Sequence, residues 1–188
     1  MDQIKIVAVV GSLRRESYNR QLALAAKEML KGKADFEILE YQDIPLMNQD
    51  IEFPAPAPVK RIREQVAGAD GLWFFTAEYN HSFSGVLKNL IDWLSRPLSQ
   101  TEPHILGGKP AAFSGVTIGI AGTRLAQDHL VALISLLNMD VMNAPRLTIP
   151  NALGMLDEQG RLDLSSSLCY LEEQAAAFLE FIARRKAL

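Results

Sequence analysis

A polar loop follows the first apolar run of the sequence, and its side chains are of the kinds that bind a phosphate. It begins at Gly11 and offers the hydroxyls of Ser12 and Ser17, the guanidinium of Arg14 and the amide of Asn19. The next residues have helical spacing, so the loop lies at a helix N-terminus, where unpaired N–H groups and about half a positive charge favour an anion. Arginine adds charge-assisted hydrogen bonds to phosphate oxygens. The loop therefore predicts a phosphate site.

The same loop has a simpler interpretation, because Ser17 or Asn19 alone would serve as a helix cap. One cap does not account for two serines, an arginine and an asparagine in a single turn after a buried strand, so we favour the phosphate. The loop lacks the G-x-G-x-x-G spacing of dinucleotide folds and the G-K-[ST] of a P-loop. A terminal monophosphate suits it better than a triphosphate held with Mg²⁺.

A second polar loop follows the third apolar run and combines aromatic, acidic and amide groups. It contains Ala77, Glu78, Tyr79, Asn80 and Ser82. Backbone N–H and C=O groups of such a loop can contact the edge of a flat heteroaromatic ring, while an aromatic side chain covers part of its surroundings. Glu78 has two open interpretations: its carboxylate is a catalytic group, or the residue only orients its backbone toward the ligand.

Hydrophobic periodicity gives the elements that position these loops. Short apolar runs bounded by turn residues predict strands at 4–10, 36–39, 71–75 and 110–115, with a fifth at 141–142 or 146–149. Apolar residues at helical spacing predict helices at 22–30, 59–66, 87–94, 130–137 and 171–182. Four prolines in 42–58 predict an irregular loop there. Alternating strands and helices predict an α/β fold, a doubly wound parallel sheet with helices on both faces, in a single domain spanning 1–188. Ligands of such sheets bind beyond the carboxyl ends of the strands.

Composition excludes several classes of protein. The 188 residues are 48% hydrophobic with a net charge of −3 and no large basic face, which argues against nucleic-acid binding. No apolar run reaches the roughly 20 residues of a membrane helix, and residues 1–5 do not begin a signal peptide, so we expect a cytoplasmic protein. His104 and His129 lie in separate segments, which implies no metal cluster. The single Cys169 stands among apolar residues and is expected to be buried and unreactive.

Three motifs together resemble the NADPH-dependent FMN reductases, most closely the bacterial quinone and chromate reductases of that family. They are Gly11-Ser12-Leu13-Arg14-x-x-Ser17-x-Asn19, Glu78-Tyr79-Asn80-x-Ser82 and Leu87-Lys88-Asn89-x-Ile91-Asp92-Trp93. The resemblance runs from residue 4 to about residue 127. It implies a flavodoxin-like, five-stranded sheet of order 2-1-3-4-5, FMN as the cofactor, and a homodimer or homotetramer with each flavin beside a subunit interface.

The resemblance also implies which residues hold the flavin. The phosphate would bind Ser12, Arg14, Ser17 and Asn19, beside Gly11. The isoalloxazine would lie along residues 77–80 with Ser82 nearby, and the end of the fourth strand, Ser114 and Gly115 with the two residues after them, would close the other side. Two departures stand out: Ala77 replaces the proline usual before Glu-Tyr-Asn, and Thr123 replaces a glycine usual after the fourth strand.

The expected activity is two-electron transfer from NADPH or NADH through FMN to a quinone, free flavin, chromate or azo compound, in a ping-pong sequence. The flavin carries this chemistry, so no catalytic acid or nucleophile of the protein is expected. Two alternatives stay open. The first is an electron-carrier flavodoxin without NAD(P)H oxidation, although a net charge of −3 is weak for such a carrier. The second is a glycosyl-transfer enzyme with Glu78 as the nucleophile.

Overall fold

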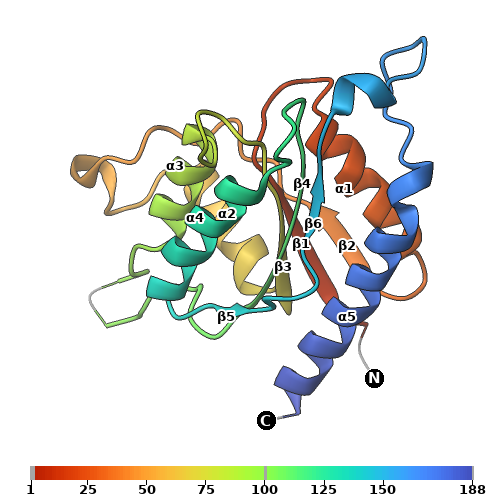
Figure 1. Cartoon of the computed structure of the whole chain (residues 1–188). Coiled ribbons are helices and arrows are strands. Elements are labelled where there is room, and N and C mark those ends of the chain that lie inside the picture. The colour runs from red at the N-terminus through yellow and green to blue at the C-terminus, as the bar shows by residue number, and fades with distance from the viewer. Residues whose placement is uncertain (1–2, 100, 188) are drawn as a thin grey trace.

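A parallel β-sheet forms the centre of the protein (Figure 1). The computed structural model describes residues 3–99 and 101–187. Strands β1 (Lys5–Val10), β2 (Asp35–Ile38), β3 (Gly71–Phe75) and β4 (Pro110–Val116) pair in parallel in the order β2-β1-β3-β4, followed by β5. The predicted class and the strand order 2-1-3-4-5 are therefore confirmed.

The fifth position of the sheet is divided between two short strands. Strand β5 (Asp140–Val141) pairs with the start of β4, and β6 (Leu147–Ile149) pairs with its end. Both segments proposed from the sequence thus contribute to the edge of the sheet, as successive pieces, and the predicted count of five strands becomes six. Pro145 lies between the pieces and has no N–H to donate, which suits a break at an edge.

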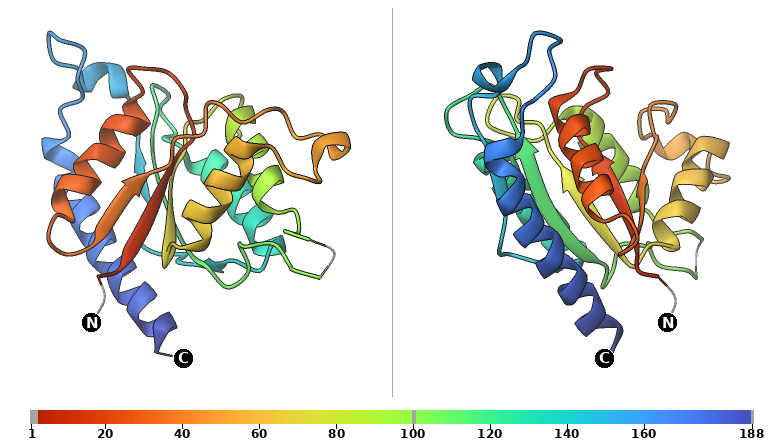
Figure 2. Two further views of the ribbon diagram at one scale, coloured as in Figure 1. Left: turned by 180° about the vertical axis from the view of Figure 1, so that it is seen from behind. Right: turned by 90° about the vertical axis from the view of Figure 1, so that its right-hand side faces the viewer.

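Helices cover both faces of the sheet (Figures 1 and 2). One face carries α1 (Tyr18–Met29) and α5 (Leu168–Lys186), and the other carries α2 (Ala57–Ala67), α3 (Gly85–Leu94) and α4 (Arg124–Leu136). Three short 3₁₀ turns, η1 (Gln49–Ile51), η2 (Ala152–Met155) and η3 (Ser165–Ser167), lie in the connections. Each predicted helix is present, and all five begin earlier than the apolar periodicity indicated.

Strand β1 explains why the sheet needs both helical layers. Ile6, Ala8 and Val10 face α1 and α5, while Val7 and Val9 face the opposite layer, and all five are at most 3% exposed. A strand buried on both sides reads as a continuous apolar run, which is how it appears in the sequence. Each fully buried valine or isoleucine contributes about 1.5–3 kcal/mol relative to an exposed one.

The proline-rich segment 42–58 is more regular than predicted. It contains η1, and α2 begins at Ala57, so Pro58 lies within the first turn of that helix. A proline is accepted there because the N–H groups of the first turn have no intrahelical acceptor. The sequence prediction of an irregular loop up to residue 58 is therefore wrong at its end.

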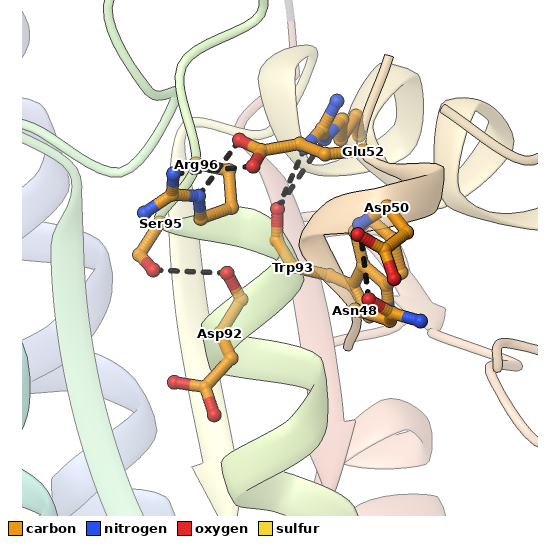
Figure 3. A network of polar contacts seen from close by, with 8 residues as sticks. Asn48, Asp50, Glu52, Asp92, Trp93, Ser95 and Arg96 are labelled. Carbon is orange, nitrogen blue, oxygen red and sulfur yellow. Dashed lines mark hydrogen bonds and ion pairs between the residues drawn. The ribbon is translucent and has the colours of Figure 1, made fainter. Parts of the chain in front are cut away.

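Side chains of α3 and its C-terminal end fasten this segment to the body of the protein. Asn89 donates to the carbonyl of Pro45 (2.9 Å) and accepts from the N–H of Met47 (2.7 Å). Beyond the helix, Arg96 makes a two-pronged ion pair with the buried Glu52, with Nε–Oε1 at 2.7 Å (Figure 3). Trp93 Nε1 adds a bond of 2.8 Å to the carbonyl of Pro45. The third sequence motif thus has a structural role in holding this segment.

Cys169 is exposed, which contradicts the prediction of a buried thiol. It lies in the first turn of α5, whose inward stripe is made instead by Leu171, Ala175, Phe178 and Ile182. Within residues 3–99 and 101–187, no helix is long and apolar enough to cross a membrane. The same described residues place no group of three or more His, Cys, Asp or Glu side chains where it could hold a metal ion.

Candidate functional site

A hollow of about 390 Å³ opens at the carboxyl edge of the sheet, where the loops after β1, β3 and β4 meet. Its lining combines hydroxyl, guanidinium, carboxylate and aromatic groups with exposed aliphatic side chains. The residues are Ser12, Arg14, Ser17, Tyr18, Asn19, Ala77, Glu78, Tyr79, Val116, Thr117, Ile118 and Leu153. This is the edge where a doubly wound sheet binds its ligand.

The structure brings most of the predicted site residues together in this hollow. Those that line it are Ser12, Arg14, Ser17, Asn19, Ala77, Glu78 and Tyr79, whereas Gly11, Asn80, Ser82, Ser114 and Gly115 lie outside its lining. Sequence reasoning missed Tyr18, Ile118 and Leu153. Leu153 arrives on η2, after the last strand, where no motif marks it, and only the tertiary fold places it beside the first loop.

The first loop ends at a capped helix with two N–H groups left over. Ser17 is the N-cap of α1, and its hydroxyl oxygen accepts from the N–H of Arg20 at 3.3 Å. The N–H groups of Tyr18 and Asn19, the first two of the helix, have no acceptor among the described residues. Unpaired N–H groups and the helix dipole together favour an anion. The cap interpretation of Ser17 is confirmed, and it leaves the phosphate interpretation intact.

Asn19 has a role that the sequence did not indicate. Its side chain is 3% exposed and forms two hydrogen bonds of 3.0 Å with the backbone of Val116, donating from Nδ2 and accepting at Oδ1. The amide therefore joins the start of α1 to the end of β4, across the floor of the hollow. One amide hydrogen remains for a ligand.

Arg14 places a cation at the mouth of the hollow. Its guanidinium carbon lies 4.4 Å from the centroid of the Tyr18 ring, in a cation–π contact, and its backbone N–H donates to the hydroxyl oxygen of Ser12 at 3.4 Å. Arg14 is exposed, so the guanidinium keeps its hydration. The first loop thus presents a cation, two hydroxyls and two free N–H groups on one side of the hollow.

The second loop is a tight two-residue turn. Tyr79 and Ser82 exchange backbone hydrogen bonds of 2.9 and 3.0 Å, while Asn80 and His81 have φ values of 51° and 61°. Two central residues with positive φ define the turn type that asparagine favours. The turn uses the N–H groups of Tyr79 and Ser82, and among the described residues those of Ala77, Glu78, Asn80 and His81 have no acceptor and could contact a ring edge.

Glu78 directs one oxygen of its carboxylate onto the start of α4. Its Oε2 accepts from the N–H of Ala126 at 3.0 Å, and the side chain is 10% exposed. Thr123, the residue at the N-cap position of α4, makes no capping bond of its own. The carboxylate therefore caps this helix from another segment, in the position where a negative charge is favourable.

Ser114 was predicted beside the flavin, and the structure places its side chain elsewhere. It is fully buried on the α1 and α5 face, where its hydroxyl accepts from Trp73 Nε1 at 2.8 Å and its O–H donates to Gln174 Oε1 at 2.5 Å. The alternation of side chains along β4 directs this residue into the core. Its hydroxyl therefore makes hydrogen bonds within the core and is not available to a ligand.

Gly115 and Thr123 are matched to each other. A Cβ at residue 115 would lie 2.1 Å from Oγ1 of Thr123 and 2.5 Å from the carbonyl oxygen of Thr76, distances that no side chain can occupy. Thr123 is fully buried, and its hydroxyl oxygen accepts from Gln127 Nε2 at 3.0 Å. The glycine makes room for the threonine, so this departure from the family pattern is accommodated within the loop beside the hollow.

Tyr41 closes the back of the first loop. It is 3% exposed, and its hydroxyl donates to the carbonyl of Val10 at 2.6 Å. Burial, with a smaller contribution from Glu40, raises the pKa of Tyr41 well above its ordinary value. The phenol therefore stays protonated at neutral pH and supplies no base to the site.

The family model of the NADPH-dependent FMN reductases matches residues 4–154. The chain belongs to this family. Membership confirms the fold class, the FMN cofactor and the oxidoreductase class expected from the three motifs.

Relatives with assigned activities extend over nearly the whole chain. A 2-hydroxy-1,4-benzoquinone reductase from a Burkholderia species is 36% identical over 183 residues, covering 97% of this chain and 98% of the relative. An NAD(P)H-dependent FMN reductase from Pseudomonas aeruginosa is 40% identical over 185 residues, covering 98% and 97%. The solved structure of FerB, a flavoenzyme NAD(P)H:(acceptor) oxidoreductase from Paracoccus denitrificans, superposes with a TM-score of 0.85 at 32% identity, covering 97% and 99%.

Proposed function

We propose that this protein is an FMN-dependent NAD(P)H oxidoreductase whose acceptors are quinones and similar small molecules, with free flavin, chromate and azo compounds as further candidates. The observation that carries the proposal is the hollow itself, which joins an anion site at the start of α1 to an apolar mouth. Tyr79, Ile118 and Leu153 are 56%, 58% and 62% exposed there. Exposed apolar side chains around a site suit a planar acceptor of low charge. The similarity to a benzoquinone reductase supports the same class.

The residues of the hollow fit a flavin mononucleotide. The N–H groups of Tyr18 and Asn19, with the hydroxyls of Ser12 and Ser17 and the guanidinium of Arg14, would hold the phosphate. The turn after β3 would hold the ring edge through the N–H groups of Glu78 and Asn80. FMN, when bound, supplies the two-electron chemistry for the nicotinamide and the acceptor in turn. The protein binds the cofactor, orients its ring and leaves one side of it accessible from the mouth.

The alternatives from the sequence find less support. A glycosyl-transfer enzyme would need the carboxylate of Glu78 free to attack a sugar, but one oxygen is bonded to Ala126 at the start of α4. An electron-carrier flavodoxin would recognise a protein partner, usually by a strongly acidic surface, and a net charge of −3 over 188 residues is small. Neither alternative accounts for the apolar mouth.

We also propose a homodimer or homotetramer in the cytoplasm, with the flavin near a subunit interface. Support for assembly comes from large aliphatic side chains on the surface, since Leu46, Ile120 and Leu136 are 81%, 88% and 79% exposed. Association between copies would remove apolar side chains of this kind from water, which is favourable. Light scattering after gel filtration, over a tenfold range of concentration, would give the mass of the assembly. A monomer throughout would refute this part of the proposal.

Steady-state turnover of the FMN-loaded protein tests the proposed function. NADPH oxidation should be catalytic with 1,4-benzoquinone. Plots of reciprocal rate against reciprocal NADPH concentration, one for each of several quinone concentrations, should be parallel lines, as for a ping-pong sequence. Chromate, free FMN and an azo dye in separate assays rank the other acceptors. FMN binding without turnover of NADPH or NADH would favour the electron carrier, and a protein that does not bind FMN would contradict the proposal altogether.

A further inference from the structure

Two side-chain contacts tie the turn at residues 77–82 to helix α4. The first is the hydrogen bond of 3.0 Å from the Ala126 N–H to Glu78. The second is a contact of 3.3 Å between the hydroxyl of Ser82 and Nδ1 of His129. The turn makes both contacts with a helix that follows it by some 45 residues, so α4 acts as its support. The Glu78 contact is the better protected of the two, because its side chain is only 10% exposed whereas His129 is exposed.

The start of α4 needs the Glu78 carboxylate. Thr123 occupies the N-cap position with φ −106° and ψ 29°, and its hydroxyl oxygen accepts from Gln127 Nε2 instead of a backbone N–H. Without Glu78, the N–H of Ala126 would be buried with no acceptor, because Ala126 is fully buried. A buried unpaired N–H is costly, so the contact holds Glu78 firmly in place.

Fixing the Glu78 side chain also fixes the backbone of the turn. Among the described residues, the N–H groups of Glu78 and Asn80 are two of the donors of this loop that have no acceptor. The first belongs to the anchored residue itself, and Asn80 lies between the two anchored residues Glu78 and Ser82. Ala77, the residue before Glu78, lacks the rigid φ of the proline usual in the family. The side-chain contact to α4 therefore supplies a constraint that the backbone at residue 77 does not.

We propose that Glu78 is a positioning residue, which holds the ring end of the flavin site by docking the 77–82 turn onto the N-terminus of α4. This inference rests on the proposed function, since it assigns the turn to the flavin ring. It assigns Glu78 no proton transfer and no nucleophilic attack. What matters is the reach of the side chain to the Ala126 N–H, and the negative charge is secondary.

Two substitutions at Glu78 separate the effect of side-chain length from the effect of charge. Glu78→Gln keeps an acceptor oxygen at the same distance and removes the charge, whereas Glu78→Asp keeps the charge and shortens the side chain by one methylene. The dissociation constants of both FMN and riboflavin are measured for each variant by flavin fluorescence. Riboflavin lacks the phosphate, so a disturbance at the ring end raises both constants by the same factor, and a disturbance at the first loop raises only that of FMN.

We expect Glu78→Gln to stay within about threefold of the wild type in both constants and in kcat for NADPH:benzoquinone turnover. We expect Glu78→Asp to raise both dissociation constants by about tenfold. The matched control is Asp128→Asn, which removes an exposed carboxylate of α4, paired with Arg146, without touching the turn. Both constants should be unchanged in this control. Circular dichroism of the bound flavin in the visible range should change in Glu78→Asp and not in the control.

The opposite ranking of the two Glu78 variants would overturn the inference. If Glu78→Asp behaves as the wild type while Glu78→Gln loses turnover with FMN still bound, the charge acts in the chemistry. If both variants bind riboflavin as the wild type does, the contact with α4 is irrelevant to the site. Failure of the proposed function is distinguishable from either result, because it would appear in the wild type, as a lack of FMN binding or of NADPH oxidation.

Discussion

Asn19 and Val116 are joined by a pair of hydrogen bonds, each 3.0 Å long, in which the side-chain amide of one residue pairs with both backbone groups of the other. The pairing imitates a step of a β-ladder between the first turn of α1 and the last residue of β4. It connects two of the three loops that form the hollow. The geometry of the phosphate end of the site therefore depends on a residue whose side chain is almost fully committed within the protein.

Asn19→Ala should lower the free energy of unfolding by about 2–4 kcal/mol, because it leaves the buried N–H and C=O of Val116 without partners. Urea unfolding of the apoprotein, followed by tryptophan fluorescence, measures the change. Asn48→Ala is a suitable control. Among the residues that the structure describes, that exposed side chain accepts only from the N–H of Asp50, so its loss should cost less than about 1 kcal/mol. Equal effects of the two substitutions would show that the Val116 pairing is unimportant.

Ser17→Ala should weaken the binding of FMN about tenfold or more, through loss of a charge-assisted hydrogen bond of about 1.5–3 kcal/mol. Riboflavin binding should be nearly unchanged, because riboflavin has no phosphate. The same variant should lose about 1 kcal/mol of stability as its N-cap bond to Arg20 disappears. Fluorescence titration with the two flavins checks the prediction. A loss of stability with unaltered FMN affinity would mean that Ser17 is a cap alone.

Ser114→Ala should destabilise the protein by about 2–3 kcal/mol, since it leaves the buried Trp73 Nε1 and Gln174 Oε1 without their shared partner. FMN affinity should not change, because the hydroxyl points into the core. Thermal or urea unfolding together with an FMN titration tests both statements, with the exposed Ser166→Ala as the control for stability. A large loss of FMN affinity without loss of stability would restore the direct contact inferred from the family resemblance.

Periodicity was enough to predict the parallel sheet and the loops that meet at its edge, because buried runs such as that of β1 mark strands directly, whereas the strand order came from the family resemblance. It was also enough to bring Ser12, Ser17 and Tyr79 to one place, since parallel strands end on the same side. It could not show that Asn19 and Glu78 point at backbone groups of distant segments, because a polar side chain looks the same in sequence whether it meets a ligand or a helix end. Cys169 was misjudged for a related reason: it has apolar neighbours, but the helical phase turns it outward.

Asp70 gives a prediction for acid stability. Burial alone would raise the pKa of Asp70, but hydrogen bonds from Lys186 and from the N–H of Lys5, both 2.8 Å long, outweigh it, so that its pKa in the folded protein is lowered. The folded protein then binds fewer protons than the unfolded chain in the acidic range. The stabilisation is therefore complete above the ordinary aspartate pKa near 4 and is lost as the pH falls through the lowered value.

Asp70→Asn should accordingly be less stable than the wild type by about 1 kcal/mol at pH 7, since it keeps an acceptor for Lys5 and loses the charge that faces Lys186. The difference should shrink below about pH 4 as the wild type becomes protonated. Urea unfolding of both proteins at a series of pH values measures it. A difference that is independent of pH down to pH 2 would contradict the lowered pKa.

The most direct test of the whole account is the visible spectrum of the FMN-loaded protein under anaerobic conditions. One equivalent of NADPH should bleach the flavin absorption near 450 nm, and one equivalent of 1,4-benzoquinone should then restore it. Bleaching and restoration with these stoichiometries are the predicted result for a two-electron reductase built on the hollow at the carboxyl edge of the sheet. A protein that retains no FMN after gel filtration, or a bound flavin that NADPH and NADH both leave oxidised, would contradict it.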